Sequence, residues 1–130
     1  MIDKVEYWLN LCDEDVLNAK AMLKGDRFLG AGFFCHQVSE KALKAVIASE
    51  TGYTPPKIHD LRKLAEFGNI YELLSKEQVL LLEKLTPFQI EARYPEYKNA
   101  IAKTINAASG KQMLKETEEF LCWVKQRLGK

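Results

Sequence analysis

The stretch RFLGAGFFCHQVSEKALKAVIASET, residues 27–51, decides the fold. Its spacing is helical, and mainly apolar residues follow two neighbouring stripes along it. The stripes run through Phe34, Val38, Ala42, Ala45 and Ser49 and through Phe33, His36, Glu40, Leu43 and Ile47. A helix with two such stripes must contact two neighbours. The stretch therefore predicts that residues 28–51 form the central helix of an all-α bundle.

A narrow polar strip remains on this helix. Long polar side chains recur there at helical spacing in Gln37, Lys41 and Lys44. Glu40 lies four residues ahead of Lys44, which is the favourable order for an ion pair. His36 lies four residues ahead of Glu40, so a structural hydrogen bond is expected between them. A solvated face or salt links between subunits explain the strip at least as well as a ligand site.

Length and composition favour one helical domain spanning residues 1–130, because 47% hydrophobic residues at this length suffice for a single core. The formal net charge of +1 gives no general argument for binding nucleic acid or membranes. The first residues contain Asp3, Glu6 and Asp13 among periodic apolar positions, so they resemble neither a signal peptide nor a membrane span. We therefore expect a cytoplasmic protein that does not enter a membrane.

The three cysteines, Cys12, Cys35 and Cys122, are widely spaced. They form no CxxC motif and no Cys/His pattern of the kind that binds zinc. We expect reduced, mostly buried thiols, with no metal site and no cofactor.

Start and stop signals place three further long helices around the central one. A D-x-x-E motif beginning at Asp3 predicts the start of the first helix, and Gly25 predicts its end in a left-handed conformation. S-x-x-Q motifs at Ser75 and Ser109 predict the starts of the third and last long helices. Thr86–Pro87 is expected to interrupt the third.

Between the central and third helices, Pro55–Pro56 must be extended, and His59 with Asp60 then opens a short helix. Residues 91–108 contain Pro95 and fit either a short helix or a packed loop, and both alternatives stay open. No segment alternates in the manner of a strand. The predicted architecture is an antiparallel up-and-down four-helix bundle with one or two short extra helices.

Three segments together resemble the HEPN domain, the higher eukaryotes and prokaryotes nucleotide-binding domain. They are HQVSEKALKA at residues 36–45, PPKIHDL at residues 55–61 and ARYP at residues 92–95. The resemblance implies an up-and-down four-helix bundle that frequently forms homodimers. In prokaryotes it also implies frequent pairing with a minimal nucleotidyltransferase, often as a toxin and antitoxin.

The resemblance also raises a catalytic question. Many HEPN proteins are metal-independent ribonucleases whose site is an Arg followed one to two helical turns later by a His. Such an Arg would stabilise the phosphate, and the His would move protons. Arg93 aligns with that arginine, but no histidine follows it in the chain. We therefore assign no catalytic residue, and the sequence favours a protein that is not an enzyme.

Eight residues are candidates for binding a ligand. Each also has a structural explanation: Arg93 suits a turn anchor as well as a phosphate contact, and the tyrosines suit a cover for the core. His59 is expected to order the short helix by packing on the prolines or bonding a backbone group. The candidates are Arg93, Tyr94, Tyr97, His59, Lys44, Lys41, Gln37 and His36.

Three functions are consistent with these observations. The preferred one is a noncatalytic HEPN module that dimerises and binds a nucleotide, an RNA or a nucleotidyltransferase partner through polar groups near Arg93 and Lys44. The second is a divergent ribonuclease toxin in which Arg93 holds the scissile phosphate and His59, His36 or Tyr97 replaces the missing histidine. The third is a dimeric scaffold that recruits another protein through an apolar surface.

Overall fold

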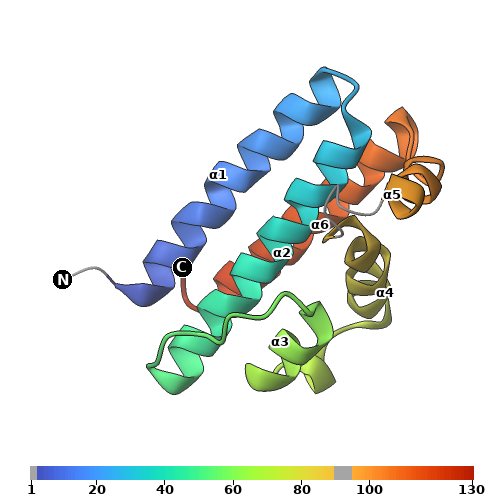
Figure 1. The fold of residues 1–130 in the computed structure, drawn as a ribbon. Coiled ribbons are helices and arrows are strands. Elements are labelled where there is room, and N and C mark those ends of the chain that lie inside the picture. Colours follow the sequence, from blue (N-terminus) through green and yellow to red (C-terminus); the bar gives the residue numbers. More distant parts are fainter. Residues whose placement is uncertain (1–2, 90–94) are drawn as a thin grey trace.

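The computed structural model describes residues 3–89 and 95–130, which form helices and connecting segments with no β-strand among them. In chain order the elements are α1 (Lys4–Lys24), α2 (Phe28–Thr51), α3 (Leu61–Phe67), the 3₁₀ helix η1 (Tyr71–Leu73), α4 (Lys76–Leu85), the 3₁₀ helix η2 (Thr86–Gln89), α5 (Pro95–Ala102) and α6 (Ala107–Arg127) (Figure 1). The all-α prediction is confirmed. None of the described helices is both long and apolar enough to cross a membrane.

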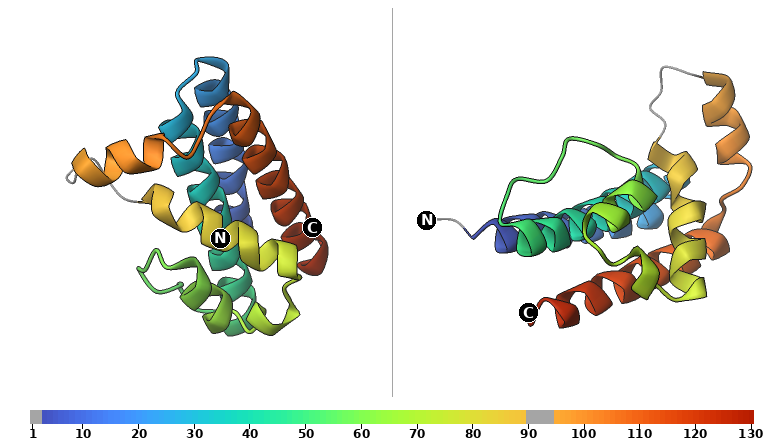
Figure 2. Two further views of the ribbon diagram at one scale, coloured as in Figure 1. Left: turned by 90° about the vertical axis from the view of Figure 1, so that its right-hand side faces the viewer. Right: turned by 90° about the horizontal axis from the view of Figure 1, so that it is seen from below.

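Helix α2 lies at the centre of the molecule. The long helices α1, α2 and α6 run lengthwise beside one another, with α2 antiparallel to α1 (Figure 1). The shorter elements α3, η1, α4 and η2 form a second group, in which α3, α4 and η2 pack on α2 and η1 packs on α3. Helix α4 has ten residues, and it lies oblique to α2 in both views of Figure 2. The expected up-and-down arrangement of four long helices is therefore not confirmed.

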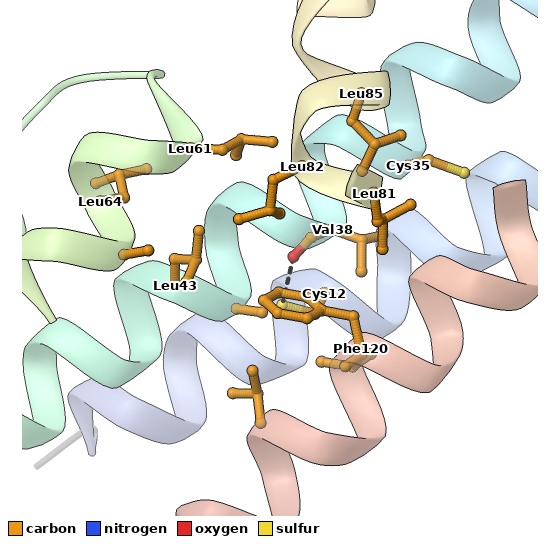
Figure 3. Packing of buried hydrophobic residues seen from close by; sticks show 14 of the residues in the cluster. Cys12, Cys35, Val38, Leu43, Leu61, Leu64, Leu81, Leu82, Leu85 and Phe120 are labelled. Atoms are coloured by element: carbon orange, nitrogen blue, oxygen red, sulfur yellow. Dashed lines mark hydrogen bonds between the residues drawn. The ribbon is translucent and has the colours of Figure 1, made fainter. Parts of the chain in front are cut away.

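The hydrophobic core lies where the long helices and the second group pack on α2. Figure 3 shows buried side chains converging from α1, α2, α3, α4 and α6, including Cys12, Leu43, Leu64, Leu82 and Phe120. The Cys12 thiol donates to the backbone oxygen of Val38 at 3.4 Å, which ties α1 to α2. Most residues of α2 that face either neighbour are buried. The prediction of a helix with two packed faces is thus confirmed.

Several predicted helix signals operate as expected. The Asp3 carboxylate accepts from the backbone at the start of α1, and Ser75 with Gln78 forms a reciprocal capping box at the start of α4. Gly52 ends α2 with a φ of 73°. Pro87 ends the regular helix, as predicted, because the chain continues from Thr86 as the 3₁₀ turn η2.

Two helix-end predictions are wrong in detail. Helix α6 begins at Ala107, because Asn106 is its cap and Ser109, the third residue of the helix, completes the capping box. The helix therefore starts one turn earlier than the motif at Ser109 predicts. At the end of α1, Gly25 has a φ of −93°, and Asp26 takes the left-handed conformation with a φ of 56°. A short polar side chain tolerates that conformation better than most.

Candidate functional site

A buried carboxylate, Glu40 of α2, organises a cluster of polar side chains. Only 3% of Glu40 is exposed. Its Oε2 accepts from the Lys44 ammonium at 3.0 Å, so the predicted Glu40–Lys44 pair is confirmed. Its two oxygens also lie 3.0 and 3.1 Å from Nδ1 of His59. We call Glu40, Lys44, His59 and the adjacent His36 the Glu40 cluster.

His36 is the most deeply buried member of this cluster, with 1% of its surface exposed. Its Nδ1 is 3.7 Å from Oε1 of Glu40 and has no hydrogen-bond partner among the described residues. The expected hydrogen bond between them is therefore absent. Burial lowers the pKa of His36 to about 4, and the nearby Glu40 carboxylate only partly opposes this effect. His36 is consequently neutral near pH 7.

Lys44 and Lys41 connect α2 to α1. Lys44 is buried, and its ammonium lies 5.4 Å from the centre of the Trp8 ring. Lys41 forms an ion pair with the buried Asp15. The solvated-face interpretation of the polar strip is therefore wrong for Lys44, and both lysines pair within the chain. Gln37 is partly buried on the same helix.

His59 approaches Glu40 from the segment between α2 and α3. Asp60 is the cap of α3, where its carboxylate accepts from the backbone of Lys63 at 3.0 Å. This cap and the buried Pro55 fix the segment at both ends. His59 was expected to bond a backbone group or pack on the prolines, but it contacts the Glu40 carboxylate. The imidazole side chain remains 57% exposed.

The contact between Glu40 and His59 was missed because helical periodicity relates only residues within one helix. The two residues are 19 positions apart, and a turn separates them. Their one common signal in the sequence is that each belongs to a segment that resembles the HEPN pattern, residues 36–45 and 55–61.

The candidate residues from the C-terminal half of the pattern are placed only in part. Arg93 and Tyr94 lie outside the described residues. Tyr97 belongs to α5, but its side chain is also outside the described part. Their roles therefore stay predictions, whereas His59, Lys44 and His36 are shown to gather around Glu40.

A concavity in the described part of the chain lies away from the Glu40 cluster. It encloses about 530 Å³ between the α4–η2 segment, α5 and α6, with Phe88, Ile101 and Met113 in its walls. A smaller hollow of about 250 Å³ is lined by Lys4, Tyr7, Trp8 and Thr54. No group of three His, Cys, Asp or Glu side chains within residues 3–89 and 95–130 is placed to hold a metal ion.

The fold and the site together define a class of protein. It is an all-helical domain with a histidine–carboxylate cluster at its central helix. The HEPN domain family matches residues 5–127, nearly the whole chain. The chain therefore belongs to the HEPN family, and the resemblance in its sequence is confirmed.

A solved structure supports the fold. The chain is similar to the crystal structure of the protein TT1696 from Thermus thermophilus, with a TM-score of 0.78 and 19% sequence identity. The similarity covers 96% of this chain and 98% of the other. No curated protein sequence gave a significant match.

Proposed function

We propose that this protein is a noncatalytic HEPN module that binds a nucleotide or RNA and acts with a minimal nucleotidyltransferase partner, as in toxin–antitoxin pairs. We further propose that it is a cytoplasmic homodimer. Membership of the HEPN family supports the ligand class. The noncatalytic part depends on a single observation, which is where the two histidines of the chain lie.

Both histidines precede Arg93 in the sequence, so neither occupies the position of the HEPN ribonuclease histidine. His36 is buried and neutral, and a proton cannot pass between its ring and a substrate in solvent. His59 is accessible, but it lies on the segment that precedes α3 and not on the helix that follows Arg93. The standard pairing of Arg and His along one helix is therefore missing.

A binding assay on the purified protein tests this proposal. We expect adenosine monophosphate or mixed-sequence single-stranded RNA to bind, and the RNA to remain intact. Replacing Arg93→Ala should weaken binding by about tenfold, because a charge-assisted contact with phosphate is lost. Arg127→Ala is the control, since this arginine lies over the Trp123 ring on α6. If the protein binds neither probe, the ligand part of the proposal is refuted.

A pull-down with the nucleotidyltransferase encoded next to this gene, where one is present, tests the partner. Sedimentation of the purified protein tests the dimer. A dimer that binds no nucleotide or RNA would favour the scaffold function. A monomer that binds neither the probes nor the enzyme would contradict the ligand, partner and dimer parts of the proposal.

One observation favours the ribonuclease alternative. Glu40 orients an exposed imidazole, and an imidazole held in this way can transfer protons to and from a substrate. If the protein cleaves RNA, and both Arg93→Ala and His59→Asn abolish cleavage, the noncatalytic proposal is wrong. Cleavage that survives both changes would indicate a contaminating nuclease.

A further inference from the structure

We propose that Glu40 is a positioning residue that holds the His59 imidazole with its Nε2 turned outward to contact a phosphate group. This inference rests on the proposed nucleotide- or RNA-binding function and deepens it by naming the contact. It concerns the segment before α3 and does not depend on where Arg93 lies.

The geometry fixes which ring nitrogen is available. Nδ1 of His59 lies within 3.1 Å of both Glu40 oxygens. An ionised carboxylate only accepts hydrogen bonds, so Nδ1 must carry the hydrogen. Nε2 is then the nitrogen that gains or loses a proton, and it bonds to none of the described residues. With 57% of the side chain exposed, a ligand can reach it.

The charges within the Glu40 cluster favour an anion at that position. Lys44 balances the Glu40 charge within the cluster, and His36 is neutral. When His59 is protonated, the cluster therefore carries one net positive charge at its exposed end. The neighbouring Asp60 carboxylate is turned to the backbone of α3 as a cap. A phosphate oxygen is a strong acceptor for an imidazolium N–H in such surroundings.

The alternative is that His59 only anchors the segment between α2 and α3. Anchoring needs a donor at the Nδ1 position and nothing at Nε2. The change His59→Asn separates the two roles, because the asparagine amide nitrogen lies close to where Nδ1 lies and can still donate to Glu40. The asparagine side chain has no counterpart of Nε2. A pure anchor would tolerate this change, whereas a phosphate contact would be lost.

Binding is measured on the whole protein with two probes, adenosine monophosphate and a short single-stranded RNA. We expect His59→Asn to weaken binding of at least one probe by about tenfold, with thermal stability close to that of the unaltered protein. The probe that is affected distinguishes a free nucleotide from an RNA backbone. Lys111→Ala, an exposed lysine on α6, serves as the control and should bind normally.

A spectroscopic measurement tests the positioning role of Glu40 separately. In ¹⁵N-histidine spectra of the unaltered protein at mildly alkaline pH, we expect His59 to be the tautomer with hydrogen on Nδ1. Glu40→Gln should populate the other tautomer, because an amide can also donate to Nδ1. In the unaltered protein, each probe that binds should shift the Nε2 resonance of His59.

Three results would overturn the inference. Normal binding of both probes by a folded His59→Asn variant would show that His59 is only an anchor, and the proposed function would survive. A His59 ring with its hydrogen on Nε2 in the unaltered protein would remove the positioning role. No binding of either probe by the unaltered protein would refute both the inference and the proposed function.

Discussion

At the scale of single residues, Glu40 is the buried anion on which Lys44 and His59 depend. A carboxylate removed from water is tolerated only when donors and cations surround it. Lys44 depends on Glu40 in the same way, because its buried ammonium has Glu40 as its ion-pair partner and the Trp8 ring beside it. Removing one partner therefore leaves the other charge buried without compensation, which lowers the stability of the fold.

Replacing Glu40→Ala should lower the free energy of unfolding by about 3 kcal/mol, because the change leaves a buried ammonium unpaired. Urea denaturation of the purified variant measures this. Glu66→Ala is the matched control, since Glu66 pairs with Arg62 at 3.1 Å on the exposed surface of α3. That control should cost less than about 0.5 kcal/mol. Equal losses in the two variants would contradict the structural importance of the cluster.

His36 should make stability depend on pH. Its pKa is about 4 in the folded protein against an ordinary value of 6.5, so the unfolded chain binds this proton more readily. The stabilisation is complete above pH 6.5 and is lost as the pH falls towards 4. Between about pH 7 and pH 4.5 the contribution should fall by about 2 to 3 kcal/mol.

The comparison with His36→Gln isolates this effect, because glutamine does not titrate. Urea denaturation of both proteins across the range should show the stability advantage of the unaltered protein shrinking as the pH falls. An advantage that stays constant with pH would show that His36 titrates normally in the folded state.

The residue scale also shows the limit of reasoning from spacing. The pair Glu40–Lys44 was predicted because both residues lie on one helix, four positions apart. His59 comes from another segment, so only the path of the chain after Gly52 determines that it meets Glu40. Burial of Lys44 was likewise not predictable from spacing, because it depends on how α1 brings Trp8 against α2.

At the scale of elements, small residues near the start of α2 allow close packing. A methyl group added to Gly32 would overlap the ring of Phe88, which is buried at 6% exposure in η2. One added to Gly30 would meet the flexible end of Met22 on α1, with the sulfur 2.6 Å away. The two glycines therefore allow Phe88 of η2 and Met22 of α1 to pack closely on α2.

The two glycines form a matched test. Gly32→Ala should lower the free energy of unfolding by about 1 to 3 kcal/mol, since a buried aromatic ring must move. Gly30→Ala should be close to neutral, because Met22 can rotate away and alanine favours the helix by up to about 1 kcal/mol. Thermal denaturation of both variants measures the difference. A neutral Gly32→Ala would mean that η2 does not pack on α2 as described.

The bounds of the elements were predictable where local chemistry sets them. Residues 28–51 were predicted as the central helix, and α2 has these bounds. The start of α6 was misplaced because Asn106 and Ser109 are both good capping residues and only the fold selects between them. The third long helix proved to have ten residues, because Thr86–Pro87 converts its continuation into a 3₁₀ turn.

At the scale of the whole molecule, α2 contacts both long helices, α1 and α6, and also the shorter elements α3, α4 and η2. Two of the three cysteines lie in this core, and all three are free thiols. Burial raises the pKa of Cys12 to about 12 and that of Cys35 to about 11. Cys122 is exposed on α6.

Thiol alkylation should therefore report global unfolding. Iodoacetamide reacts with thiolates, so the folded protein should gain one adduct, at Cys122, on the time scale of an ordinary labelling experiment. In concentrated urea all three cysteines should react, as counted by mass spectrometry. Rapid labelling of Cys12 or Cys35 under native conditions would show that the core opens locally. A Cys122→Ser variant, which should gain no adduct when folded, is the control.

The sequence by itself determined the helical class, the family, the central helix and most caps, because these depend on periodicity and on residues close together in the chain. Tertiary structure decided that α4 is short and oblique, and that Lys41 and Lys44 of the polar strip contact Asp15 and Trp8 of α1. It also decided that His59 is the partner of Glu40. Contacts of this kind bring together distant segments, and their geometry follows from how several helices fill one core.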